Sequence, residues 1–145
     1  MRGLLVVLIL CIGCAPGFDG VRQVITNGNM LVIGAVRTVS DVDSYYKQQI
    51  LHDMERLCKA KPEPAKCVME EGEKRFTDYK MKRDVAVKAI KDTSIALKAA
   101  ADILPLVEAG SKNPKDLNGW ISKATAALPT LSQAVSELGL LPGGK

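Results

Sequence analysis

The residue types that can do chemistry are few in this chain. Histidine occurs once, at His52, with Asp53 and Glu55 beside it. A catalytic base needs a nucleophile or substrate-positioning groups within hydrogen-bond reach, but the chain has no Gly-x-Ser-x-Gly motif. His52 also falls off the apolar stripe of its segment, so we interpret it as a solvated surface residue. We assign no catalytic residue and expect no enzyme activity.

Acidic side chains gather once, at Glu70, Glu71 and Glu73, next to Lys74 and Arg75. At helical spacing these carboxylates point around the helix rather than to one site, which is typical of a solvated charged face. The chain also has neither a glycine-rich phosphate loop nor a Cys/His set with zinc-ligand spacing. We therefore expect no metal and no cofactor.

Two of the four cysteines, Cys58 and Cys67, flank the Lys-Pro-Glu-Pro sequence at residues 61–64. The prolines end one predicted helix just before another begins, so the two cysteines face each other across a turn. A bridge closing a loop of about ten residues contributes roughly 2.5–3 kcal/mol in the chain-entropy model. A redox or metal site would need further ligands nearby, so we predict a structural disulfide.

The first fourteen residues have the pattern of a sorting signal. Arg2 supplies a positive charge, residues 4–12 are apolar, and the small residue Gly13 precedes Cys14. As a helix, residues 4–14 reach roughly 17 Å at about 1.5 Å per residue, against about 30 Å of bilayer hydrocarbon. This length favours a cleaved secretory signal over a transmembrane anchor.

The ending Ile12-Gly13-Cys14 resembles the lipobox of bacterial lipoproteins, although Cys11 stands where that class prefers leucine. The resemblance implies that residues 1–13 are a signal peptide and that Cys14 is the lipid-modified first mature residue. It also implies an anchor that can be labelled with a palmitate analogue. Ala15, rather than Asp, follows Cys14, which in enterobacterial-type lipoproteins implies sorting to the outer membrane, facing the periplasm. Loss of Cys11 and lipidation of Cys14 leave Cys58 and Cys67 as a pair.

Composition favours a small all-helical protein. Aromatic residues make up only 4% of the chain, and alanine is frequent. Without residues 1–13 the net charge falls from +4 to +3, because Arg2 is the one charged residue removed, and this mild charge gives no reason to expect a nucleic-acid partner. We expect a lipidated tether at residues 14–20, a helical domain at 21–140 and a disordered tail at 141–145.

A first helix is predicted over residues 21–59. Its apolar side chains recur every three or four residues. The expected buried face is Val21, Ile25, Val32, Ala35, Val39, Val42, Tyr46, Ile50 and Leu57. Gly28, within Asn-Gly-Asn, is either a break or a site of close helix packing, and we favour continuity.

A second helix is predicted from residue 65 or 66 to 109, with Phe76 and Tyr79 on its buried face. The short link makes the two helices an antiparallel hairpin, with Tyr46 near Tyr79 and Gly28 near Leu97.

A third helix is predicted after residues 110–114, where the second helix ends and a new one begins. Gly110 is suited to the left-handed cap, Asn113 to the N-cap and Pro114 to the first helical position. Pro129 should kink this helix or cut it in two. The predicted fold is therefore all-α: a long antiparallel helical hairpin clamped by a disulfide, plus a third proline-kinked helix along its membrane-proximal half, as a three-helix bundle.

Tyr45, Tyr46, Phe76 and Tyr79 gather near the closed end of the predicted hairpin. They are interpreted either as an aromatic plug in the core or as a partner-binding patch, since aromatics are enriched in binding hot spots. Arg83 lies on the buried stripe, where it extends its charge to solvent, pairs with Asp43 or lines a groove.

These features predict a membrane-anchored periplasmic lipoprotein with a structural or protein-binding role at the cell envelope, and another envelope protein as its partner. Two alternatives are a phage or prophage envelope lipoprotein acting in lysis or superinfection exclusion, and a carrier of a hydrophobic ligand in a helical groove. Both are compatible with the lipobox and the helical body.

Overall fold

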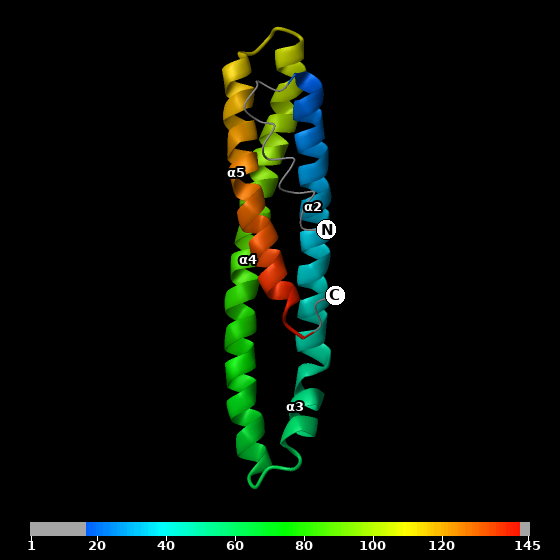
Figure 1. Ribbon diagram of the computed structural model, residues 1–145, viewed down its shortest axis with the longest axis vertical. Helices are drawn as coiled ribbons and strands as arrows, with labels where there is room; N and C mark the ends of the chain where they lie inside the picture. Colours follow the sequence, from blue (N-terminus) through cyan, green and yellow to red (C-terminus); the bar gives the residue numbers. More distant parts are fainter. Residues whose placement is uncertain (1–16, 143–145) are drawn as a thin grey trace. The chain divides into compact units, whose positions relative to one another are not determined.

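The computed structural model describes residues 17–142, and all regular structure within them is helical. Four helices follow one another: α2 (Phe18–Gln48), α3 (Ile50–Cys58), α4 (Pro64–Glu108) and α5 (Pro114–Gly139) (Figure 1). No strand occurs in this part of the chain. The predicted all-α class is confirmed, whereas the lipobox, Cys14 and residues 143–145 lie outside the described residues.

The first predicted helix differs from the structure at two places. It begins at Phe18, so residues 18–20 are helical rather than part of a tether. It passes through Gly28 without interruption, as predicted, but a turn residue, Gln49, separates α2 from α3. Gln49 has φ −118°, which departs from the helical value, yet its amide still donates to the Tyr45 carbonyl at 2.8 Å. The break is therefore local to one residue.

The predicted stop and start between α4 and α5 is confirmed. Gly110 has φ +70°, the left-handed conformation that glycine adopts without steric cost. The Asn113 side-chain oxygen accepts a hydrogen bond from the Lys115 amide at 2.9 Å, which is an N-cap, and Pro114 opens α5. Pro129 lies inside α5, which stays one helix, so the alternative of two separate helices is wrong.

The chain forms two compact units, and α2, α4 and α5 each contribute to both. The first unit consists of the described residues up to Val32 together with Lys91–Pro129. Its core consists of two clusters of buried aliphatic side chains, and Trp120 packs against both. These residues are Val21, Ile25, Ala96, Leu97, Ala100, Leu104, Val107, Leu117, Ile121 and Ala124. Leu97 packs directly against Gly28, as predicted.

The second unit consists of Ile33–Ile90 and the residues from Thr130 onward. Its buried hydrophobic side chains come from all four helices and the segment after α5. They are Ala35, Val42, Tyr46, Ile50, Met54, Cys58, Ala86, Ala89, Leu131, Ala134, Leu138 and Leu141. Leu141 was predicted to lie in a disordered tail, but it is buried and its amide donates to the Leu138 carbonyl.

Leu57 was predicted to be buried, and this is wrong: 53% of its surface is exposed. Met54 and Cys58 take the buried positions of α3 instead. They follow Ile50 at intervals of four residues, which keeps them on one helix face. Phe76, also predicted to be buried, is 43% exposed because it lies at the edge of the contact between α2 and α4.

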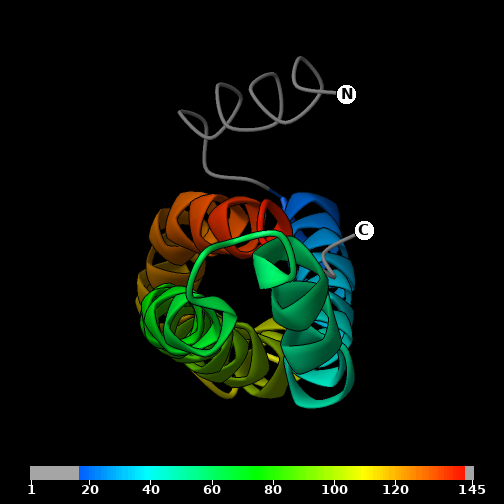
Figure 2. The same ribbon diagram turned by 90° about the horizontal axis from the view of Figure 1, so that it is seen from below.

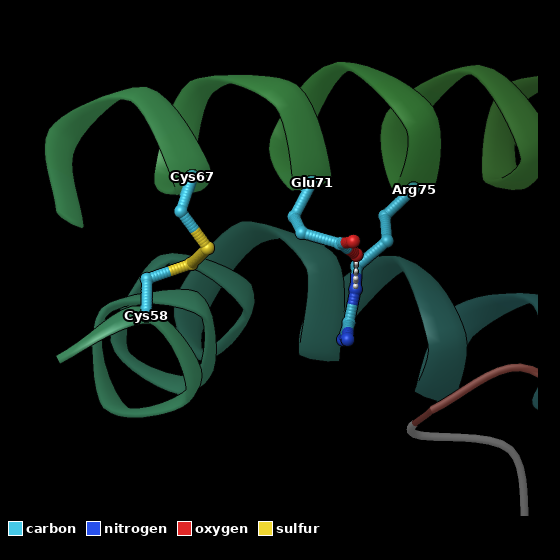
Figure 3. The surroundings of a disulfide bond; sticks show 4 residues. All are labelled: Cys58, Cys67, Glu71 and Arg75. Carbon is cyan, nitrogen blue, oxygen red and sulfur yellow. Dashed lines mark ion pairs between the residues drawn. A yellow bond between two sulfur atoms is a disulfide. The ribbon is translucent and has the colours of Figure 1, made fainter. Parts of the chain in front are cut away.

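Residues 59–63 join α3 to α4, and Figure 2 shows this loop crossing from the end of one helix to the start of the other. The predicted disulfide closes it: Cys58 and Cys67 are bonded, with their Cα atoms 5.7 Å apart (Figure 3). The last turn of α3 is thereby fixed to the first turns of α4.

Candidate partner-binding surface

An aromatic cluster joins α2 to α4 in the second unit. The rings of Tyr46 and Tyr79 stack with centroids 4.1 Å apart and planes at 11°. Phe76 and Tyr45 each meet Tyr46 edge-on, at 5.8 Å and 5.5 Å. Offset-stacked and edge-on pairs are the favourable geometries for aromatic rings. The structure therefore brings the four predicted aromatic residues together around Tyr46.

Asp43 links this cluster to Arg83. The Tyr79 hydroxyl donates to Asp43 Oδ1 at 2.6 Å, and Arg83 Nε donates to the same carboxylate at 3.0 Å and 3.2 Å. Burial, together with this hydrogen bond, raises the pKa of Tyr79 to about 12. The carboxylate also raises the pKa of Arg83. Of the three predicted roles for Arg83, pairing with Asp43 is confirmed.

Tyr45 forms a second phenol–carboxylate pair. Its hydroxyl donates to Asp53 Oδ2 at 2.5 Å and so connects the end of α2 to α3 across the break at Gln49. Burial and this hydrogen bond raise the pKa of Tyr45 to about 12, and the same bond lowers the pKa of Asp53. Arg75 of α4 pairs with Glu71 at 3.5 Å (Figure 3) and acts electrostatically on Tyr45 and Asp53.

This geometry leaves little of the cluster free to bind a partner. Tyr46 is buried, and the hydroxyls of Tyr45 and Tyr79 are both taken by carboxylates. Phe76 is the one member of the four that is exposed, whereas Tyr45 and Tyr79 are half-buried. The cluster thus has the geometry of a packed plug with one exposed edge.

An open groove lies between α3 and the start of α4, with a volume of about 790 Å³. Its α4 side is apolar and its α3 side is polar. The lining residues are His52, Glu55, Arg56, Lys59, Pro64, Ala65, Val68 and Met69. Met69 is 75% exposed. The disulfide fixes the relative position of the two walls. Such a groove can accept an apolar side chain or chain segment while its rim contributes polar contacts.

The remaining candidates show no constellation for chemistry. His52 is exposed and lies 3.9 Å from Asp53, whose carboxylate is already engaged by Tyr45. Glu70 and Glu73 are exposed, whereas Glu71 pairs with Arg75. Within residues 17–142 no group of three or more His, Cys, Asp or Glu side chains is placed to hold a metal ion.

No helix in the described part of the chain is long and apolar enough to cross a membrane. No protein family, characterised protein or solved structure shows significant similarity to the chain.

Sequence reasoning missed two members of the polar network, Asp53 and Arg75. Asp53 was considered only as a neighbour of His52. Its contact with Tyr45 depends on the one-residue break at Gln49, which no glycine or proline marks. In a continuous helix a spacing of eight residues is just over two turns, or about 12 Å, so the sequence carried no signal for this contact.

Proposed function

We propose that this protein is an exported lipoprotein, anchored by lipid at Cys14, that binds another protein of the cell envelope. The observation that supports binding is the groove between α3 and α4, whose walls are joined by the Cys58–Cys67 disulfide. A preformed surface of this kind binds without the entropic cost of ordering its walls. The lipobox resemblance supports the anchor and the outer-membrane address.

A three-helix arrangement is part of this proposal. α2 contacts α4 in each compact unit, through Gly28 and Leu97 in the first and Tyr46 and Tyr79 in the second. Both helices run through both units without a break at the boundary. These contacts favour one long antiparallel hairpin that displays the disulfide-closed end to partners, with α5 as the third helix.

The anchor is tested by labelling expressing bacteria with a palmitate analogue. Cys14→Ser should abolish the label and the processing of residues 1–13. Cys11→Ser is the matched control, because that cysteine leaves with the signal peptide, and it should keep both. Label retained by Cys14→Ser contradicts the lipobox assignment.

Partner binding is tested by placing a photo-crosslinking amino acid at Met69, in the groove, of the membrane-anchored protein. A discrete crosslinked protein band, absent when the same amino acid replaces the exposed Gly119 of α5, is the expected result. Equal crosslinking from the two positions contradicts a specific partner surface at the groove.

The apolar wall of the groove also favours a second candidate function, binding of a hydrophobic ligand. Solvent extraction of the purified full-length protein, followed by mass spectrometry, should then recover a non-covalently bound molecule, whereas the covalent anchor at Cys14 stays with the protein. Met69→Glu places a charge in the groove and should remove that molecule. An extract without such a molecule contradicts ligand carriage.

A further inference from the structure

One side of the contact between α2 and α4 in the second unit is occupied by α5. A Cβ added at Gly139 of α5 would lie 3.9 Å from the Thr38 side chain, so α5 packs on that side of α2. Tyr46 of α2 stacks on Tyr79 of α4. Counted around the axis of α2 at about 100° per residue, Thr38 lies about 80° from Tyr46. Val36 lies about 80° from Tyr46 in the opposite sense. Val36 therefore points to the side of the contact that α5 leaves open.

The matching side of α4 is also apolar. Around the axis of α4, three apolar residues lie about 60° to 80° from Tyr79, in the same direction of rotation as Val36 from Tyr46 on α2. They are Phe76, Met69 and Val87. Because α2 and α4 are antiparallel here, the same direction of rotation about each helix axis points to the same side of the helix pair. Phe76, Met69 and Val87 therefore lie on the side of Val36. The antiparallel direction follows from Asp43 meeting Arg83 while Cys58 meets Cys67.

These apolar residues define an open face of the second unit. Val36 is 50% exposed, Val87 is 40% exposed, and Phe76 and Met69 are exposed as well. Met69 also lines the groove between α3 and α4, so the face is continuous with the groove. Met69 and Val87 are 18 residues apart on α4, or roughly 27 Å at 1.5 Å per residue. Exposed apolar side chains spaced along one side of a helix pair over this length, here with Lys80 and Arg83 between Phe76 and Val87, are typical of a helix-binding surface.

Two lysines flank this face. Lys47 follows Tyr46 and Lys80 follows Tyr79, so each lies about 100° from its stacked neighbour, toward the open side. The stack places them at the same level, one on each helix. Both are exposed, and neither has an ion-pair partner among residues 17–142. Glu73, also exposed, lies about two turns from Lys80 along α4.

Arg83 does not add to the free charge of this face. It lies about 40° from Tyr79 on the same side, but Asp43 and Asp84 pair with it at 3.0 Å and 3.5 Å. The charges of this face that have no ion-pair partner among residues 17–142 are therefore the two lysines, which lie at one level, and Glu73, about 10 Å from Lys80 along α4.

From this juxtaposition we infer that the open face formed by Val36, Phe76, Val87 and Met69 binds an acidic amphipathic helix of about 18 residues from a partner protein. The apolar stripe of the partner helix lies between α2 and α4 on the side opposite α5. Its carboxylates face Lys47 and Lys80. The inference rests on the proposed partner-binding function and specifies the class of partner.

The test uses the full-length lipoprotein in detergent and two helical peptides of 18 residues. Both peptides carry the same leucine stripe; one has glutamates along its flanks, the other lysines. We expect the acidic peptide to bind at least about tenfold more tightly, and added salt to reduce the difference. Equal affinity for the two peptides, or no binding of either, overturns the inference.

Matched variants on α4 locate the site. Val87→Glu should weaken the acidic peptide at least about tenfold, because it places a carboxylate in the apolar face. Val85→Glu is the control: Val85 is 50% exposed but lies about 120° from Tyr79 in the other sense, so binding should not change. Equal effects of the two variants overturn the inference.

Charge reversal gives a readout that general loss of structure cannot produce. Lys80→Glu should weaken the acidic peptide and strengthen the basic one. Lys74→Glu, at an exposed lysine about 140° from Tyr79 on the far side, should change neither affinity. If Val87→Glu fails to fold, as judged by circular dichroism, the exposed Lys80 variant decides the question.

Crosslinking in membranes separates this inference from the proposed function. A photo-crosslinker at Val87 should capture a distinct protein, while one at Val85 should not. A protein captured from Met69 but not from Val87 supports the proposed function and overturns this inference. Capture of lipid or a second copy from Val87 also overturns it. No protein captured from any of the three positions contradicts both.

Discussion

Gly28 lies so close to Leu97 that a Cβ atom at residue 28 would stand 2.7 Å and 2.8 Å from the two methyl carbons of that leucine. Leu97 is fully buried. The absence of a side chain at Gly28 thus lets α2 approach α4 in the first unit. A glycine in mid-helix, which lowers helix propensity by about 1 kcal/mol relative to alanine, is retained here at a packing contact.

We expect Gly28→Ala to destabilise the protein by about 1 kcal/mol, because overpacking of roughly 1–3 kcal/mol outweighs the gain in helix propensity. Gly34→Ala is the matched control on the same helix, since nothing lies within 4 Å of its added Cβ. It should stabilise by about 0.5–1 kcal/mol. Urea unfolding of the two variants measures the difference, and a stabilising Gly28→Ala would contradict the close contact.

A double-mutant cycle makes this assignment specific to Leu97. In a Leu97→Ala background the obstructing methyl groups are gone, so Gly28→Ala should become neutral or stabilising. The coupling energy between the two positions should be about 1 kcal/mol or more. Additive effects would mean that some other contact sets the cost at residue 28.

Asp43 accepts hydrogen bonds from both Tyr79 and Arg83, and its side chain is only 18% exposed. Asp43→Ala leaves two donors without their acceptor, so we expect a loss of about 1–3 kcal/mol in the free energy of unfolding. Tyr79→Phe removes one neutral donor and should cost less, about 0.5–1.5 kcal/mol. Asp41→Ala, at an exposed residue of the same helix, is the control. Chemical denaturation distinguishes these outcomes.

The tyrosines of the cluster should ionise late in an alkaline titration. The pKa is about 12 for both Tyr45 and Tyr79, above the ordinary value of 10.0, and burial raises the pKa of Tyr46 as well. Because the folded state holds these protons more tightly than the unfolded chain, this contribution to stability is complete below about pH 10. It is lost as the pH rises toward 12.

Ultraviolet absorbance of tyrosinate measures this behaviour directly. Folded protein should show its main rise well above pH 10, and protein in urea should titrate near pH 10. Asp53→Asn removes the carboxylate that accepts the hydrogen bond from the Tyr45 hydroxyl, so the part of the absorbance rise due to Tyr45 should move to lower pH while the part due to Tyr79 stays. Coincident curves for folded and unfolded protein would contradict the burial of these phenols.

Contacts that follow from chain reversal were predictable from the sequence. Two prolines after a periodic apolar stripe fix where the chain turns, and counting back from the turn pairs Tyr46 with Tyr79 and Gly28 with Leu97. Helix caps were equally predictable, because Asn113 and Gly110 act through bonds within a few residues. Such local chemistry does not depend on tertiary context.

The break at Gln49 was not predictable in this way, and the errors at the candidate site follow from it. Periodicity treats residues 21–59 as one helix and therefore assigns Leu57 to the buried face. The turn at Gln49 ends that continuity, so Met54 and Cys58 are buried and Asp53 meets Tyr45. Phe76 is exposed because it lies at the edge of the contact between α2 and α4, and no local pattern encodes that position.

Removing the disulfide should affect one end of the second unit most strongly. Cys58→Ala together with Cys67→Ala opens a loop of roughly ten residues, which should lower the free energy of unfolding by about 2–3 kcal/mol. Reduction of the native protein provides a control that leaves the side-chain positions filled. A larger loss in the double variant than on reduction would measure the packing contributed by Cys58, which is fully buried.

Hydrogen exchange determines whether that loss is local. Amide protection in α3 should fall when the bridge is absent, because its nine residues are bounded by the break at Gln49 and the loop at residues 59–63. Amides near Leu97 lie in the other compact unit and should keep their protection. Since α3 forms one wall of the groove with Met69, the same variant should also weaken capture of a partner from that position. Uniform loss of protection in both units would show instead that the disulfide stabilises the whole chain and does not specifically fix the groove.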